Sequence, residues 1–113
     1  MPPEIYASDG DCGGYEKLST ITSSTGFTAA KVEPTSGSFR GRIAKAVLIT
    51  VETASIRFTM DGTTPVVTGA SEAGSKVDAG QSYVVRGHRS IRNFRCINEV
   101  ASNGAKVFCH FFY

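Results

Sequence analysis

The feature that most constrains the fold of this chain is a series of short segments with alternating side chains, separated by turn signals. The clearest lie at residues 42–52, 56–60, 82–87 and 105–113. Ile56, Phe58 and Met60 alternate with polar residues, the pattern of a strand that buries one face. Asp61-Gly62 predicts a tight turn, and Asn103-Gly104 is a strong hairpin signal. The pattern therefore predicts an all-β domain.

Other parts of the chain extend this prediction. Residues 42–52 are apolar or small on both faces, as in the central strand of a sheet. Weaker strands are expected at residues 17–22, 27–32 and 91–97, the last with a bulge or bend. Residues 68–79 are small and polar, which favours a long surface loop. No segment has a helical period, so we expect a compact β-sandwich or jelly-roll-like domain of six to eight short antiparallel strands.

Length and composition indicate one folded domain. The chain has 113 residues, 41% of them apolar, and contains only two leucines, which favours strands over helices. Residues 18–113 are expected to form the domain. Residues 1–17 are expected to form an irregular N-terminal arm, because Pro2-Pro3 favours extended backbone and residues 9–14 are loop-like. This arm either frays or is held by a neighbouring subunit.

Charge and hydropathy limit the classes of partner. The formal net charge of +2 is too balanced to indicate nucleic acid. No apolar run approaches the roughly 18 residues of a membrane helix. The N-terminus lacks the pattern of a signal peptide, so we expect synthesis in a reducing cytoplasm. The three cysteines are expected to be thiols, although Cys96 and Cys109 lie on candidate neighbouring strands whose register leaves open whether they face each other.

Motifs that would carry chemistry are weak. Cys109 and His110 are adjacent on an expected strand, so their side chains point to opposite faces and do not form a nucleophile and base. Asp9 and Asp11 flank a glycine, but an ordinary turn explains them better than a cation site. We therefore expect no catalytic, cofactor or metal site, and a small hydrolytic enzyme is the least favoured function.

Two features suggest an interface. Five basic residues fall between Arg86 and Arg95, and they form either a solvated strand edge, which we favour, or a docking surface for protein or, least favoured, nucleic acid. The aromatic C-terminal strand either lies between two layers or contributes to a subunit interface. Aromatic and aliphatic side chains in the arm favour the interface. The candidate interface residues are Ile5, Tyr6, Tyr15, Arg86, Arg89, Arg92 and Phe112.

Four elements also carry a family resemblance. They are V-L-I-T-V-E-T-A-S-I-R-F-T-M-D-G-T-T-P at residues 47–65, A-G-Q-S-Y-V-V-R-G at 79–87, I-R-N-F-R-C-I at 91–97 and a terminal strand that ends in Tyr113. In this order and spacing, they resemble a class of small β-sandwich proteins in the virions of tailed bacteriophages. The resemblance covers roughly two thirds of the chain, from about residue 44 to residue 113. Residues 1–40 match no family.

The resemblance implies a non-enzymatic virion structural protein. The leading expectation is a capsid decoration, or cement, protein that is made in the host cytoplasm, binds the major capsid protein and stabilises the shell from the capsid surface. It would act as a homo-oligomer, a dimer or trimer, because a symmetric oligomer that makes several weak contacts at once binds tightly overall. The alternative is a tail- or head-fibre surface module that binds a host receptor or glycan. The absence of tryptophan disfavours a sugar-stacking platform.

Overall fold

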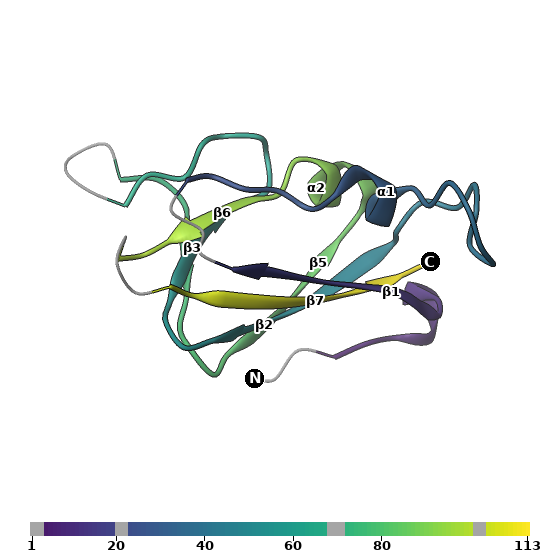
Figure 1. The fold of residues 1–113 in the computed structure, drawn as a ribbon, viewed down its shortest axis with the longest axis horizontal. Helices are drawn as coiled ribbons and strands as arrows, with labels where there is room; N and C mark the ends of the chain where they lie inside the picture. Colours follow the sequence, from purple (N-terminus) through teal and green to yellow (C-terminus); the bar gives the residue numbers. More distant parts are fainter. Residues whose placement is uncertain (1–3, 20–22, 68–71, 101–103) are drawn as a thin grey trace.

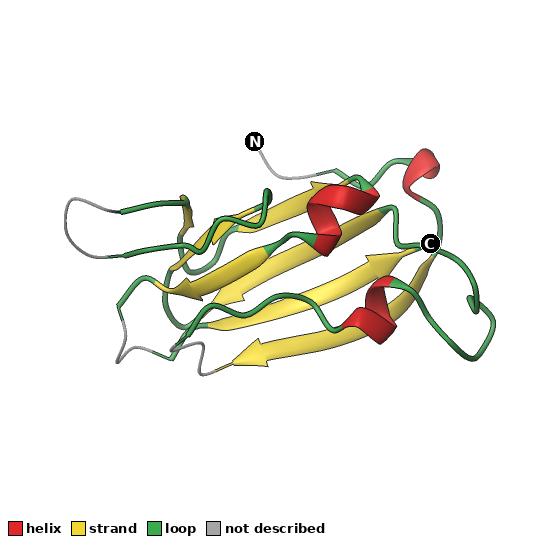
Figure 2. Cartoon of the chain, turned by 90° about the horizontal axis from the view of Figure 1, so that it is seen from above, coloured by secondary structure: helices red, strands yellow, loops and turns green. Residues whose placement is uncertain are grey.

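The computed structural model describes residues 4–19, 23–67, 72–100 and 104–113, and in these ranges the chain is an all-β domain of two antiparallel sheets (Figure 1; Figure 2). The four-stranded sheet has the order β1 (Cys12–Ser19), β7 (Lys106–Phe112), β2 (Ala46–Glu52) and β5 (Ser82–Arg86). The three-stranded sheet has the order β4 (Ser75–Val77), β3 (Ile56–Thr59) and β6 (Arg95–Asn98). Short helices occur at η1 (Ala7–Asp9), α1 (Ala29–Val32) and α2 (His88–Arg92). The predicted fold class is confirmed.

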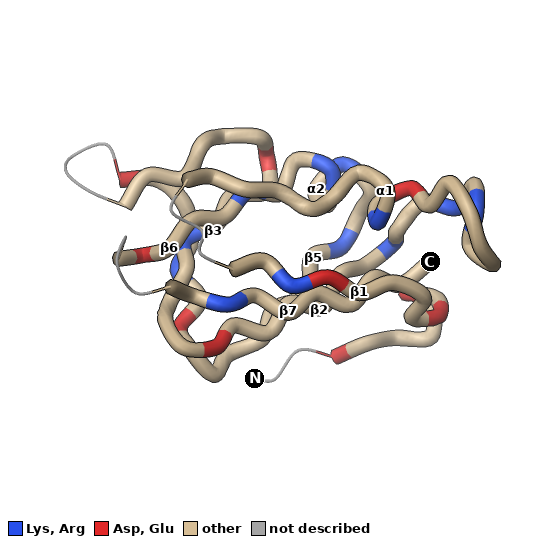
Figure 3. The backbone as a smooth tube through the Cα atoms, in the orientation of Figure 1, with Lys and Arg blue, Asp and Glu red and all other residues tan. Residues whose placement is uncertain are grey.

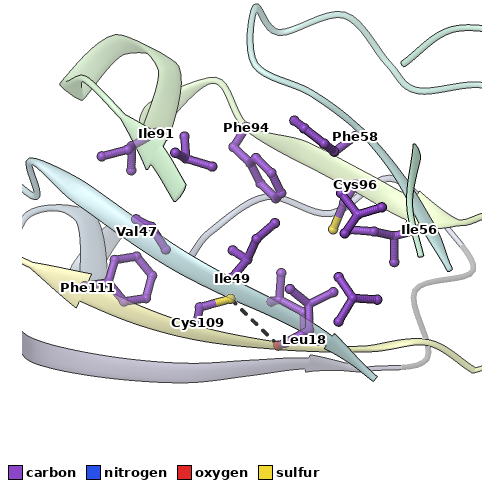
Figure 4. Close-up of a cluster of buried hydrophobic side chains, with 14 of the residues drawn as sticks. Leu18, Val47, Ile49, Ile56, Phe58, Ile91, Phe94, Cys96, Cys109 and Phe111 are labelled. Atoms are coloured by element: carbon purple, nitrogen blue, oxygen red, sulfur yellow. Dashed lines mark hydrogen bonds between the residues drawn. The ribbon is translucent and has the colours of Figure 1, made fainter. Parts of the chain in front are cut away.

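The core lies between the two sheets, where their facing side chains meet (Figure 4). Ile56 and Phe58 from β3 are buried, as their alternation predicts, and Met60 is half-buried against the same cluster. Phe94 is the aromatic centre, since its ring stacks on Phe27 at 4.3 Å and lies 5.7 Å from Phe58. Aromatic pairs of this kind add stability beyond the area that they bury.

Strand β2 is central, as its two apolar faces predict. It pairs with β7 on one side and β5 on the other, and Val47, Ile49 and Val51 are fully buried. The strand begins at Ala46, four residues later than expected. The reason is that the amide of Ala44 donates to the carbonyl of Val32 in α1, at 2.8 Å. This amide is therefore not available for the hydrogen bonds that join β2 to its neighbouring strands.

The N-terminal region is more ordered than expected. Residues 12–17, predicted to be irregular, form most of β1, which pairs with β7 along its length. A bulge between Cys12 and Gly14 lets the glycine-rich stretch join the sheet. The strand buries Leu18 in the core, and this burial offsets part of the entropy of ordering the segment.

Three further expectations are corrected. Residues 27–32 are not a strand, because Ala29, Ala30 and Lys31 are good helix formers and begin α1. Residues 88–92 turn into α2 after Gly87, whose φ of 92° redirects the chain, so β6 begins only at Arg95. The expected loop at 68–79 contains β4. Residues 20–22, 68–71 and 101–103 of the predicted strand, loop and hairpin lie outside the described residues.

Gly10 allows the N-terminal segment to cross the end of β7. Its φ is +88° and its ψ −162°, and a Cβ there would lie 2.2 Å from the carbonyl oxygen of Tyr113. We expect Gly10→Ala to lower the melting temperature and to expose residues 4–11 to limited proteolysis. Gly80→Ala is the matched control, because Gly80 has a φ of +87° but nothing within 4 Å of the new methyl group. Equal losses from both variants would contradict the steric argument.

Candidate protein-docking surface

The four-stranded sheet has one face on the core and one face that points away from it, which we call the outer face. The register of the strands places four groups of side chains on this face. Their members are Tyr15 and Lys17 from β1, Lys106, Phe108, His110 and Phe112 from β7, Ala46, Leu48 and Thr50 from β2, and Ser82, Val84 and Arg86 from β5.

An aromatic patch occupies the β1 and β7 side of the outer face. Tyr15 is 47% exposed, and its ring lies 5.2 Å from that of His110. Phe108 and Phe112 are half-buried beside them, and Leu48 follows on β2. A β-sheet face that carries this many apolar groups outside the core is typical of a surface that a partner covers.

The N-terminal segment is fastened at the β5 side of the outer face. The Arg86 guanidinium donates to both carboxylate oxygens of Asp9, each at 3.1 Å, and also to the carbonyl of Glu4. It lies over the Tyr6 ring, 4.6 Å from its centre. Asp9 is only 5% exposed, and it also accepts the amide of Tyr6 at 2.8 Å. Arg86 is therefore a clamp that holds the segment in place.

The candidate interface residues fall into two groups. Tyr15 and Phe112 lie on the outer face, and Arg86 brings Ile5 and Tyr6 to its β5 side. Ile5 and Tyr6 remain 39% and 53% exposed.

Arg89 and Arg92 form the second group and lie on α2, away from the outer face. Leu48 and His110 are not among the candidate interface residues predicted from the sequence, because only the pairing of β7 with β2 and β1 brings them into the patch.

The second group belongs to a basic end of the molecule (Figure 3). Arg92 contacts Glu33 of the α1 region at 2.9 Å, and His88 faces the same carboxylate at 3.5 Å. Arg95, by contrast, points to Ser24 and ties β6 to the loop before α1. The predicted basic stretch is thus divided, and its members do not form one strand edge.

The three cysteines are free thiols and form no disulfide. Cys96 and Cys109 are buried thiols on strands of different sheets, so the expectation that they lie on neighbouring strands is wrong. Burial raises the pKa of Cys96 to about 12 and raises that of Cys109 as well. Cys12 is exposed on β1, 3.9 Å from Nδ1 of His110.

We expect one thiol to react in the folded protein. A chromogenic disulfide reagent at pH 8 should titrate Cys12 quickly, while Cys96 and Cys109 should react only after denaturation, because they are buried as thiols. Cys12→Ser should remove the fast phase. Fast labelling of a second thiol in the native protein would contradict the described core.

Two ion pairs make the stability of the fold depend on pH in the acidic range. The hydrogen bond from Arg86 lowers the pKa of Asp9 below its ordinary value of 3.8, and that from Arg57 lowers the pKa of Glu99 below 4.5. A carboxylate whose folded-state pKa is lowered adds stability above its unfolded pKa, and this stability is lost as pH falls through the folded value.

We therefore expect the urea midpoint to be flat between about pH 6 and 8 and to fall below about pH 5. The double variant Asp9→Asn, Glu99→Gln should be less stable at pH 7 and should lose less on acidification. Glu52→Gln, which replaces an exposed carboxylate, is the control. An unchanged acid slope in the double variant would contradict the assignment.

Comparison of the chain with protein-family models, with curated proteins and with solved structures finds no match. Within the described ranges, no group of three or more His, Cys, Asp and Glu side chains is arranged to hold a metal ion. None of the helices in these ranges has the length and apolar character to cross a membrane. The candidate site is therefore defined by the geometry of the outer face alone.

Proposed function

We propose that this chain is a non-enzymatic binding protein that docks on a protein surface through the outer face of its four-stranded sheet. The observation that carries this proposal is the aromatic patch, in which Tyr15, Phe108 and Phe112 lie outside the core on one rigid sheet. Sheets hold such side chains in fixed positions, so little entropy is lost when a partner covers them.

The proposed partner is the shell of a tailed-phage major capsid protein, and the proposed role is capsid decoration. This assignment rests on the resemblance of residues 44–113 to small β-sandwich proteins of phage virions. A dimer or trimer would place several outer faces on the shell at once, and linked weak contacts add to a tight one. Copies that bridge neighbouring capsid subunits would stabilise the shell.

The test is co-sedimentation with empty, undecorated shells of the phage that carries this chain. Light scattering first gives the mass of the protein alone. We expect a discrete dimer or trimer that pellets with the shells at a fixed ratio and saturates with concentration. A protein that stays in the supernatant at micromolar concentration would contradict the decoration role, and a glycan array would then test the fibre alternative.

A further inference from the structure

A groove of about 620 Å³ lies at the end of the four-stranded sheet, beside the outer face and distinct from it. It opens where three strands meet, because residues 41–45 lead into β2, Gly87 follows β5 and Tyr113 follows β7. The described residues that line it are Gly41, Arg42, Ile43, Ala44, Lys45, Gly87, His88 and Tyr113.

The floor of the groove is fixed by backbone hydrogen bonds. The Lys45 amide donates to the Phe112 carbonyl at 2.8 Å, and the Gly87 amide donates to the Lys45 carbonyl at 3.1 Å. The Tyr113 hydroxyl donates to the Lys31 carbonyl. Ala44 is fully buried beneath this network. The groove is therefore formed before any partner arrives, which favours binding.

The walls combine an apolar side chain with cations. Ile43 is 44% exposed, so its aliphatic side chain is accessible to a partner. Arg42 and Lys45 flank it and are exposed, and neither makes an ion pair within the described ranges. The described residues that line the groove include no Asp or Glu.

We propose that this groove binds an acidic segment of the partner protein. An apolar side chain of that segment would rest on Ile43, and carboxylates on either side would meet Arg42 and Lys45. The inference deepens the proposed function, on which it rests, because it gives the chemistry of a second contact with the same partner. Complementary charges at such a site raise the association rate and select the partner.

Nucleic acid fits the groove less well than an acidic protein segment does. Nucleic acid would need an exposed aromatic ring for base stacking, but Tyr113, the aromatic residue in the lining, is only 2% exposed.

The test uses a fluorescent nine-residue peptide with a central phenylalanine between two runs of glutamate, followed by fluorescence anisotropy. The matched peptide carries glutamine in place of glutamate. We expect the acidic peptide to bind with a Kd on the order of 100 μM at low salt and to weaken severalfold at 0.3 M salt. Arg42→Glu with Lys45→Glu should weaken it at least about tenfold.

Two more variants distinguish binding in the groove from nonspecific attraction of the peptide to the positive charge of the protein. Ile43→Ser should weaken the acidic peptide severalfold, whereas Lys76→Glu at the opposite end should leave binding unchanged. All variants change exposed side chains, and thermal melts check that each is folded. Equal binding of both peptides, no effect of the Arg42 and Lys45 reversals, or tighter binding of a single-stranded oligonucleotide of equal length would overturn the proposal.

The same variants applied to the shells distinguish this proposal from the proposed function. Shell binding that survives reversal of Arg42 and Lys45, together with no peptide binding, would overturn the groove but keep the decoration role. Peptide binding that depends on both residues, without any binding to shells, would keep the groove chemistry and overturn the capsid as its partner.

Discussion

Phe94→Ala is expected to destabilise the domain by about 3–5 kcal/mol, the usual cost of removing a buried phenylalanine. Phe94 is 1% exposed, and its ring contacts Phe27 and Phe58, which come from a loop and from the three-stranded sheet. The substitution leaves a cavity where the two layers meet. Small domains have a total stability of about 5–15 kcal/mol, so the variant should retain only part of it.

The measurement is urea denaturation followed by circular dichroism, with thermal melts in parallel. We expect a fall in melting temperature on the order of 15 °C. Phe108→Ala is the matched control, because Phe108 has the same side chain but lies half-buried on the outer face. Its effect should be several times smaller. A loss for Phe108→Ala as large as that for Phe94→Ala would show that the outer face is part of the folding core.

The outer-face variant Tyr15→Ala with Phe108→Ala is expected to weaken binding to the capsid shells by at least about 30-fold. Central aromatic residues of an interface often contribute more than about 2 kcal/mol each to binding. Tyr15 is 47% exposed in the free protein, so its removal should change stability little. The assay is the saturating co-sedimentation proposed above, with the bound fraction measured over a range of concentrations.

Tyr83→Ala is the control for this experiment. Tyr83 is 36% exposed, close to Tyr15 in accessibility, but it lies at the edge of the core-facing side, where its ring is 5.1 Å from that of Phe58. We expect it to lower stability and to leave shell binding intact. Loss of binding in Tyr83→Ala at a temperature where it is folded, or full binding by the outer-face variant, would contradict the proposed docking surface.

Local sequence patterns were sufficient to predict the strands whose side chains alternate clearly and the turns that carry typical turn residues. Ile56 and Phe58 alternate and are buried, and the Asp61 carboxylate accepts the Thr63 amide at 3.0 Å in the predicted turn. These features depend on neighbours a few residues away, and such neighbours are visible in a sequence. By contrast, α1 and α2 are only four and five residues long, too short to produce a helical period.

The candidate surfaces needed long-range contacts. Tyr15 and Phe112 could be recognised as unusual aromatic residues, but only the pairing of β1 with β7 places Tyr15 opposite His110. Arg86 looked like a docking cation, yet its contact with Asp9, 77 positions earlier, makes it an internal clamp. The groove likewise joins residues 41–45 to Gly87 and Tyr113, which no local pattern connects.

The sequence by itself determined that the chain is an all-β domain with buried strands, because side-chain alternation and turn residues act over a few positions. Only the tertiary structure decided which strands are neighbours, which face of the four-stranded sheet lies outside the core, and which charges are already paired. Those outcomes follow from strand register, since a shift of one residue exchanges the two faces of a strand and with them every surface described above.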